Sequence, residues 1–339
     1  MGSSSSRPAA KRPAKRKATM QTEPSTATAS RAVRPGAPAA QGEKPANARS
    51  RAHAAMPVPA AAHRVGEPLL PVPPDAESTD RQFAINLARG LQVLRAFTPA
   101  EPMLGNRELA DRTGLPKATI SRLTYTLTLL GYLNRSEKYQ RYRLGAGVLT
   151  LGYPMLAAMQ VRQIARPYME KLARETRCTV NLGMRDRLNV VYVDTCRPGR
   201  DNNAQPDIGS TRPLLATSIG RALLIAESAK ERAAVLNRLR LSDPERYALD
   251  RDIWEADRAA FAERGFTLSR GDWLRDIHAI AVPVRQPPDE ERIALNCTVV
   301  SRRLADDWLE RTVAPLLLEA ALRIERACGV TDASAAGIR

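Results

Sequence analysis

"TGLPKATISRL", Thr113 to Leu123, is the stretch that decides the fold of the first ordered part of this sequence. Gly114 and Pro116 predict a tight turn followed by a helix, because glycine commonly ends helices and proline favours their first positions. The new helix starts with short and hydroxylated side chains and an arginine, Arg122. Such a start is typical either of an ordinary exposed first turn or of a helix that must fit closely against a flat, polar partner.

The residues on both sides predict two more helices and a hairpin. Residues 83–97, "FAINLARGLQVLRAF", repeat apolar side chains at helical spacing. Asn106 is the expected N-cap of a short helix, "RELADRTG", that Gly114 ends. The helix after Pro116 carries an apolar face and stops at Gly131, and "YLNRSEKYQRYRLG" alternates like two strands around a tip at residues 137–140. Residues 80–145 therefore predict a winged helix-turn-helix domain.

The 339 residues carry a formal net charge of +16, which indicates nucleic acid or an anionic surface as partner. Residues 1–79 hold twelve Lys or Arg against five Asp or Glu and few large apolar side chains, so we expect a disordered basic tail rich in Ala, Pro and Ser. Its densest basic run, "KRPAKRK" at Lys11–Lys17, fits either a non-specific phosphate-binding arm or a solubilising tail.

Several classes of protein are disfavoured. No run of uncharged apolar residues is long enough to span a membrane, so no membrane partner is expected. The four cysteines lack CxxC spacing and only three histidines are present, which argues against a disulfide framework and against a metal site. We expect no metal and no cofactor.

Beyond the hairpin, residues 146–160 predict a linker helix, residues 161–330 a larger domain, and residues 331–339 a flexible tail. The larger domain opens with a helix at 164–177 and two strands at 178–184 and 188–195, and it closes with an amphipathic helix at 304–328. Between them lie helices from residues 218, 230 and 251 and strands from residues 266, 278 and 293. This mixture of antiparallel strands and separate helices predicts an α+β fold.

The helix after Pro116 suits the major groove of DNA. Small side chains let a helix approach base edges, while cations neutralise phosphates or address guanine. The basic hairpin can reach the DNA backbone or minor groove, although a solvated charged hairpin has the same composition. Tyr139 and Tyr142 are expected to pack rather than to stack on bases. The candidate DNA-contacting residues are Asn106, Lys117, Ala118, Thr119, Ser121, Arg122, Lys138, Gln140 and Arg141.

Six stretches between residues 83 and 328 form a specific combination. They are "LARGLQVLRAF", "ELADRTGLPKATISRLTYTLTLLGYL", "YRLGAGVLTLGY", "STRPLLATSIGRALLIA", "RGFTLSRGDWLRDIHAIAVPV" and "ERIALNCTVVSRRL". This combination resembles the IclR family of transcriptional regulators. Together with "RLADDWLERTVAPLLLEAALRIE", the first stretch looks closest to the branch that regulates protocatechuate, hydroxybenzoate and β-ketoadipate catabolism.

The resemblance implies a winged helix, a linker helix and a GAF/PAS-like effector-binding domain. It implies a homodimer or homotetramer on palindromic double-stranded DNA in the bacterial cytoplasm, at the nucleoid, acting as repressor or activator, with RNA polymerase as a further candidate partner. The effector would be a small organic acid, aromatic or short-chain. The effector-binding positions carried over by the resemblance are Gly209, Ser210, Ser269, Ile277, Ala279, Asn296 and Thr298.

Physical reasoning supports this placement. Gly209 permits close backbone approach, and free amides at residues 217–220 would open a helix with its positive dipole end outward. Asn296 and Thr298 are two apart on one strand and so share a face. Ser269 and Ala279 stand where relatives carry an acidic residue and a cysteine, which favours a bulkier acid than glyoxylate. His278 and Arg212 are each open to a ligand role or a structural or surface role.

Two other functions compete with a ligand-responsive regulator. A non-specific architectural DNA-binding protein would need only the basic charge, but it would not need about 170 further residues of ordered domain. A hydrolase with Cys178 or Cys297 as nucleophile would need a positioned base, and the one histidine of the folded part, His278, lies on an apolar strand. The sequence therefore predicts no enzyme and no catalytic residue.

Overall fold

The computed structural model describes residues 82–199, 208–288, 290–300 and 307–330. The two expected tails, residues 1–79 and 331–339, lie outside the described residues, and so does the basic run at Lys11–Lys17.

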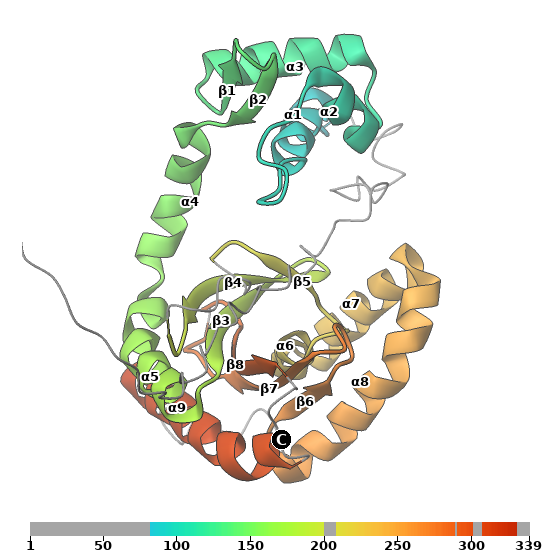
Figure 1. Ribbon diagram of the computed structural model, residues 1–339. Coiled ribbons are helices and arrows are strands. Elements are labelled where there is room, and N and C mark those ends of the chain that lie inside the picture. The colour runs from blue at the N-terminus through green and yellow to red at the C-terminus, as the bar shows by residue number, and fades with distance from the viewer. Residues whose placement is uncertain (1–81, 200–207, 289, 301–306, 331–339) are drawn as a thin grey trace, which may run out of the picture. The chain divides into compact units, whose positions relative to one another are not determined.

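The amino-terminal domain is a winged helix-turn-helix, as the sequence predicts (Figure 1). Its elements are α1 (Ile85–Arg95), α2 (Asn106–Thr113), α3 (Lys117–Leu129), β1 (Leu133–Ser136) and β2 (Arg141–Leu144). The two strands pair antiparallel, with Leu133 opposite Leu144. Leu104 and Tyr142 exchange backbone hydrogen bonds and so join the segment before α2 to the hairpin.

One small core holds these elements together. Its buried apolar side chains come from all three helices and from the hairpin, so each element contributes one face. Gly114 and Gly131 end α2 and α3 in the left-handed conformation that glycine tolerates, with φ values of 69° and 77°. The buried members of the core are Val93, Ala96, Leu104, Leu109, Ile120, Leu127, Leu133 and Tyr142.

The start of α2 differs from the prediction. Asn106 is the first residue of the helix, and Gly105 is the N-cap. The Glu108 carboxylate accepts the backbone N–H of Gly105 at 2.6 Å, so a residue three positions into the helix satisfies the backbone at its start. The prediction of Asn106 as the N-cap was therefore wrong, and its amide is free to contact other residues.

Helix α4 (Ala146–Ala158) follows the hairpin and has no buried residue along its length. Its exposed side chains are unusually apolar for a helix in contact with water, and they include Leu149, Leu151, Tyr153 and Met155. A contiguous exposed apolar surface of this kind marks an interaction site.

The carboxy-terminal domain is an α+β fold built on one six-stranded sheet. Its elements in order are α5 (Gln160–Thr176), β3 (Thr179–Asp186), β4 (Asn189–Cys196), β5 (Thr211–Pro213), α6 (Ser218–Ala226), α7 (Ala229–Ser242), α8 (Pro244–Arg264), β6 (Thr267–Arg270), β7 (Ile277–Val284), β8 (Ile293–Val300) and α9 (Ala314–Ala327). The strand order is β5-β4-β3-β8-β7-β6, and each neighbouring pair is antiparallel.

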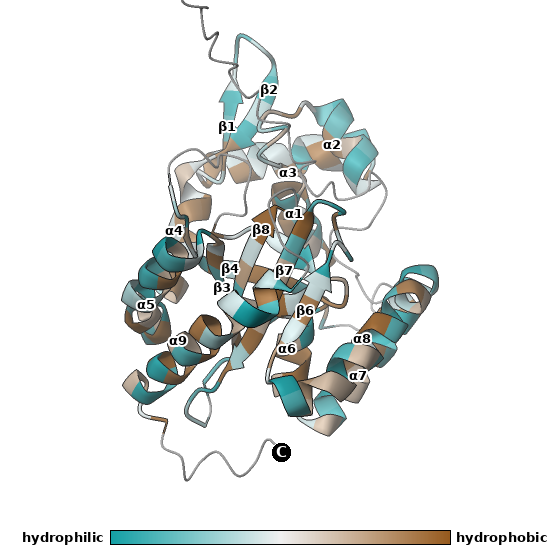
Figure 2. Cartoon of the chain, turned by 60° about the horizontal axis from the view of Figure 1, so that its bottom comes forward, coloured by the Kyte–Doolittle hydropathy of each residue, from teal (hydrophilic) through white to brown (hydrophobic). Residues whose placement is uncertain are grey.

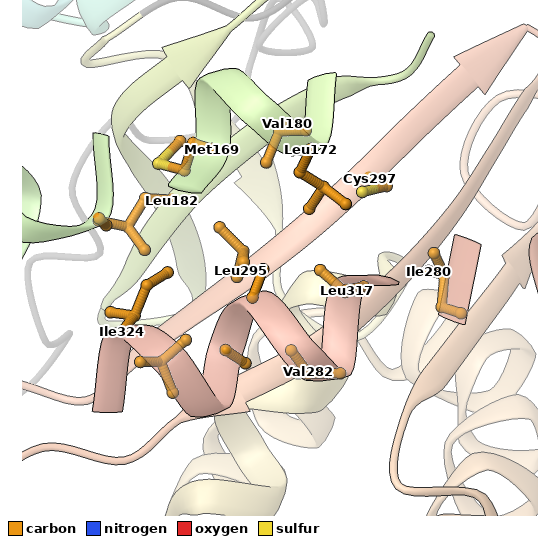
Figure 3. Close-up of a cluster of buried hydrophobic side chains, with 14 of the residues drawn as sticks. Met169, Leu172, Val180, Leu182, Ile280, Val282, Leu295, Cys297, Leu317 and Ile324 are labelled. Atoms are coloured by element: carbon orange, nitrogen blue, oxygen red, sulfur yellow. The ribbon is translucent and has the colours of Figure 1, made fainter. Parts of the chain in front are cut away.

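The two faces of the sheet have different coverings. Helices α5 and α9 pack on one face, where Met169 and Leu317 meet strand residues such as Leu182 and Leu295 (Figure 3). Helix α6 packs on the other face, and its apolar side chains contact Tyr192 and its neighbours. Because successive strand residues point to opposite faces, each strand directs alternate side chains toward α5 and α9 and toward α6.

Four features of this domain depart from the prediction. Helix α8 begins at Pro244, seven residues before the expected start at Arg251. Helix α5 begins at Gln160, four residues before the expected start. The prediction missed these residues because the apolar repeat is weak there. Strand β5 was not predicted, since three residues are too short to show an alternation. The last helix begins with a π-helical turn, Leu309–Val313, and residues 304–306 of its expected start lie outside the described part.

Candidate nucleic-acid interface and small-molecule site

The first turns of α3 form an exposed surface of low relief. Lys117, Ala118, Ser121 and Arg122 are exposed and Thr119 is partly exposed, whereas Ile120 is buried on the opposite face. Within the described part of the chain, neither Lys117 nor Arg122 forms an ion pair. Two cations without carboxylate partners beside small side chains are what a helix needs in order to approach phosphates and base edges.

Asn106 lies against this helix. Its side-chain amide donates to Ser121 Oγ at 3.3 Å, and its oxygen accepts from Thr124 Oγ1 at 3.5 Å. Asn106 therefore joins the start of α2 to the second turn of α3 and lies beside the exposed face rather than apart from it.

The hairpin is the second basic element of the domain, and Figure 2 shows it largely in the hydrophilic colour. Lys138 is exposed, while Gln140 and Arg141 are exposed but already bonded within the protein. The Gln140 amide donates to the carbonyl of Glu137 at 2.7 Å, and Arg141 pairs with Glu108 at 2.6 Å. These two residues thus shape the hairpin and hold it against α2 as well as facing solvent.

The expectation for the two tyrosines is half confirmed. Tyr142 is buried in the core of the domain, as expected. The expectation for Tyr139 was wrong, because its ring is 58% exposed and Lys138 Nζ lies 5.2 Å from its centre. A residue at the tip of a short hairpin has no neighbouring layer against which to pack.

In the carboxy-terminal domain, the strand register brings the predicted small-molecule residues to one face. Ser269 is opposite Ala279, Ala279 is opposite Thr298, and Ile277 lies two residues before Ala279. Asn296 lies two residues before Thr298 on β8. Because paired residues share a face, these five residues lie on the side of the sheet that carries α6.

Sequence reasoning missed further residues of the same row. Thr179 is opposite Thr298, and Asn181 is opposite both Asn296 and Thr195. The Asn181 amide donates to Asn296 Oδ1 at 2.9 Å, and Thr195 Oγ1 donates to Asn181 Oδ1 at 3.1 Å. The period-two alternation of polar residues along β3 was the signal that could have shown them.

This row is polar although it is buried. Asn181 and Asn296 are 0% and 1% exposed. Thr179 Oγ1 is buried and has no hydrogen-bond partner among the described residues, and the same holds for Ser210 Oγ. Buried hydroxyls without partners are unfavourable, so the row favours a polar ligand or ordered water. We call the set Ser269, Ala279, Thr298, Thr179, Asn296, Asn181 and Thr195 the polar row.

The segment before β5 adjoins this row through Tyr192. The backbone N–H of Gly209 donates to the carbonyl of Tyr192 at 2.8 Å, and the carbonyl of Ser210 accepts from the backbone N–H of Tyr192 at 3.0 Å. Gly209 has a φ of 83°, which most side chains disfavour. The backbone N–H of Gly209 is therefore used within the protein, while the side chain of Ser210 has no partner among the described residues.

The start of α6 also differs from the prediction. Thr217 is the N-cap, and its Oγ1 accepts the backbone N–H of Gly220 at 3.3 Å. Gly220 packs so closely on the backbone that a Cβ there would lie 1.8 Å from the carbonyl oxygen of Leu214. The expectation of free amides through residue 220 was therefore wrong at Gly220.

Three other candidate residues lie on the opposite side of the sheet. Register places His278 on the face of Ile280, away from the polar row. Cys178 and Cys297 are buried in the core beneath α5 and α9. Burial raises the pKa of Cys297, which keeps its thiol neutral.

The described residues contain neither a membrane-spanning helix nor a cluster of metal ligands. In the part of the chain that the structure covers, no helix is both long and apolar enough to cross a membrane. In the same residues, no cluster of three or more His, Cys, Asp or Glu side chains is arranged to hold a metal ion.

Comparisons with known proteins match both domains. Residues 86–137 match the IclR helix-turn-helix domain, and residues 154–326 match the bacterial transcriptional regulator IclR C-terminal domain. A helix-turn-helix followed by such a domain defines a DNA-binding transcriptional regulator. The chain belongs to the IclR family of bacterial transcriptional regulators.

Individual relatives agree. An IclR family transcriptional regulator from Brucella abortus is 41% identical, with a TM-score of 0.67 over 77% of this chain and 97% of that one. The HTH-type transcriptional regulator TsaQ1/TsaQ2 of Comamonas testosteroni is 38% identical over 58% of this chain and 71% of its own length. The p-hydroxybenzoate hydroxylase transcriptional activator of Acinetobacter baylyi is 28% identical over 71% of this chain and 90% of its own.

Proposed function

We propose that this protein is a sequence-specific regulator that binds a palindromic operator and releases or reshapes it when a small organic acid binds the carboxy-terminal domain. The observation that carries the DNA-binding part is the exposed start of α3, where Lys117 and Arg122 flank small side chains and have no carboxylate partner among the described residues. Bulky side chains at these positions would hold the helix away from the bases.

The proposed oligomer is a homodimer or a dimer of dimers. The exposed apolar side chains of α4 are the reason, because Leu149 and Tyr153 lie one helical turn apart and are 75% and 66% exposed. A two-fold dimer would present two copies of α3 to half-sites separated by one DNA turn, roughly 34 Å, or a multiple of it. RNA polymerase is a candidate partner of such a complex, which would act in the bacterial cytoplasm at the nucleoid.

The proposed effector is a small organic acid bound over the polar row. The row offers buried amides and unpartnered hydroxyls beside Ser210, and one relative is named for p-hydroxybenzoate hydroxylase. Effector binding would shift an existing equilibrium between conformations that differ in half-site spacing.

Operator binding is tested by fluorescence anisotropy with DNA from upstream of the gene and of its neighbours. The expected result is binding to one such fragment that about a hundredfold excess of random DNA does not displace, because specific affinity exceeds non-specific affinity by about 10³ or more. Equal displacement by random DNA would instead support the architectural alternative. Addition of organic acids to the complex then tests the effector.

A cysteine hydrolase is not favoured. The named relatives are transcriptional regulators, and Cys178 and Cys297 lie in the apolar core. We therefore infer that the chain is not an enzyme.

A further inference from the structure

Arg212 of β5 is a partly buried cation between two aromatic rings. Its guanidinium carbon lies 5.6 Å from the ring centre of Tyr192 and 4.8 Å from that of Trp273. One of its N–H groups donates to the carbonyl of Thr211 at 2.6 Å. Burial lowers the pKa of Arg212, and among the described residues no carboxylate pairs with it. Partial burial removes water from the guanidinium without supplying an anion, so this arrangement favours an anionic ligand.

The contact between Arg212 and Trp273 joins opposite edges of the sheet. Arg212 is on the edge strand β5, and Trp273 follows the other edge strand, β6. Five strand spacings of about 4.8 Å would separate these edges by roughly 24 Å in a flat sheet. The contact therefore requires a curled sheet and a loop that folds back over the face carrying the polar row.

The loop that carries Trp273 is anchored by its own ion pair. Asp272 accepts a hydrogen bond at 2.8 Å from Arg221 of α6, which is itself fully buried. The same guanidinium donates to the carbonyl of Leu268, the second residue of β6, at 2.7 Å. The bonds of the buried Arg221 therefore hold the loop that carries Trp273 against the core of the domain.

The polar row supplies groups for the rest of a ligand. The hydroxyl of Ser210, two residues before Arg212, is buried without a partner among the described residues, and so is that of Thr179. Tyr192 belongs to the same buried cluster as Ala294, two residues before Asn296 on β8, so the aromatic ring beside Arg212 lies on the same face of the sheet as the row. A ligand with an anion at one end and a polar substituent elsewhere would meet both kinds of group.

We propose that Arg212, Tyr192 and Trp273 form the acid-binding end of the effector site and that they select planar aromatic carboxylates of the benzoate class. This inference rests on the proposed function as an acid-responsive regulator. Guanidinium has five N–H donors in one plane and pairs with carboxylates through two of them. Trp273 is partly exposed and offers a ring on which an aromatic acid can stack, which an aliphatic acid does not use. Tyr192 is buried and holds the guanidinium from the other side.

The test measures binding of benzoate and 4-hydroxybenzoate to the full-length protein by isothermal titration calorimetry, with benzamide and cyclohexanecarboxylate as probes. Arg212→Met is expected to weaken binding of both aromatic acids about 10- to 100-fold, which is the loss expected for a hydrogen bond to a charged group. Benzamide, which has no charge, is expected to bind both proteins alike. Trp273→Leu is expected to weaken benzoate more than cyclohexanecarboxylate.

Two further variants guard against a folding defect. Arg212→Lys keeps the charge but loses the planar pair of donors, so an intermediate affinity is expected. Arg238→Met removes an exposed arginine of α7 and is expected to bind like the wild type. Melting temperatures of all variants are compared first. If Arg212→Met does not fold, the binding result for Arg212→Lys is used in its place.

Three results would overturn the inference. One is an Arg212→Met protein, or an Arg212→Lys protein if the former unfolds, that binds benzoate as the wild type does. Another is equal binding of benzoate and cyclohexanecarboxylate by the wild type. The third is the absence of binding by either aromatic acid to a wild type that recognises its operator, which leaves the DNA-binding function in place. Failure to recognise any operator would count against the proposed function instead.

Discussion

Arg221 and Asp257 form a fully buried ion pair, with Nε of the arginine 2.5 Å from Oδ2 of the aspartate. The same guanidinium also pairs with Asp272 at 2.8 Å. One side chain of α6 thereby joins α8 and the loop after β6. The start of α6 and the Trp273 loop, which flank the proposed acid-binding end, are held by a single cation.

Replacing this cation should destabilise the domain. Arg221→Met removes the ion-pair partner of Asp272 and leaves Asp257 with Arg264 alone. We expect a loss of about 3–5 kcal/mol in the free energy of unfolding. Urea unfolding followed by circular dichroism measures it. Arg238→Met, an exposed arginine of α7, should change the value by no more than about 0.5 kcal/mol. Similar losses for the two variants would contradict the structural role of Arg221.

Replacing Arg122 should weaken DNA binding without affecting folding. If Arg122→Ala removes a guanine contact, we expect a loss of about 1–3 kcal/mol on the operator. If it removes a phosphate contact, the loss should be uniform over sequences and the slope of log affinity against log salt should fall by about one. Anisotropy titrations at several salt concentrations distinguish the two cases.

The control for Arg122 is Lys171→Ala, which removes one exposed positive charge from α5 in the other domain. Its affinity for the operator should match the wild type. Unchanged affinity of Arg122→Ala on both specific and random DNA would remove Arg122 from the interface.

Charges on α4 should prevent dimerisation. Leu149→Glu with Tyr153→Glu places two carboxylates on one exposed apolar face of the helix, and desolvating them at an interface is costly. Analytical ultracentrifugation should show a shift towards monomer together with weaker operator binding. Leu241→Glu, at a leucine of α7 that is 69% exposed, should leave the oligomer intact. A doubly substituted protein that stays oligomeric would exclude this face of α4 as the interface.

Alkaline pH should destabilise the protein through Cys196. Burial raises the pKa of the Cys196 thiol to about 11, opposed by the positive charge of Arg166. The thiol ionises at lower pH in the unfolded chain, so its contribution to stability is fully present below about pH 8.5 and is lost as pH rises through about 11. The difference in unfolding free energy between wild type and Cys196→Ala should shrink over that interval. If the difference in unfolding free energy stays constant over this interval, the prediction is contradicted, because Cys196 would then ionise at the same pH in the folded and unfolded protein.

Local signals explain why the amino-terminal domain could be predicted almost completely. Gly114 and Gly131 end helices by their own backbone preference, and the leucine spacing of α3 requires only the helical period. The errors arose at positions whose local structure depends on contacts with neighbouring residues. Glu108, rather than Asn106, satisfies the backbone at the start of α2, and Tyr139 has no layer to pack against.

The carboxy-terminal domain shows the limit of such signals. Strands β7 and β8 were visible as apolar runs, whereas β5 has three residues and exists because Arg212 pairs with Val190 on β4. The register that brings Ser269, Ala279 and Thr298 into one row depends on strands joined by long connections. Periodicity shows which residues share a face of one strand, but not which strand lies beside it.

The amino-acid sequence by itself determined the class of protein, because turn residues, helical periodicity and the family's stretches are properties of contiguous residues. Only the tertiary structure decided that Arg212 and Trp273, 61 positions apart in the sequence, come into contact and that His278 faces away from the polar row. The physical reason is that sheet curl and strand order arise from packing between distant segments, and no single stretch of residues encodes either.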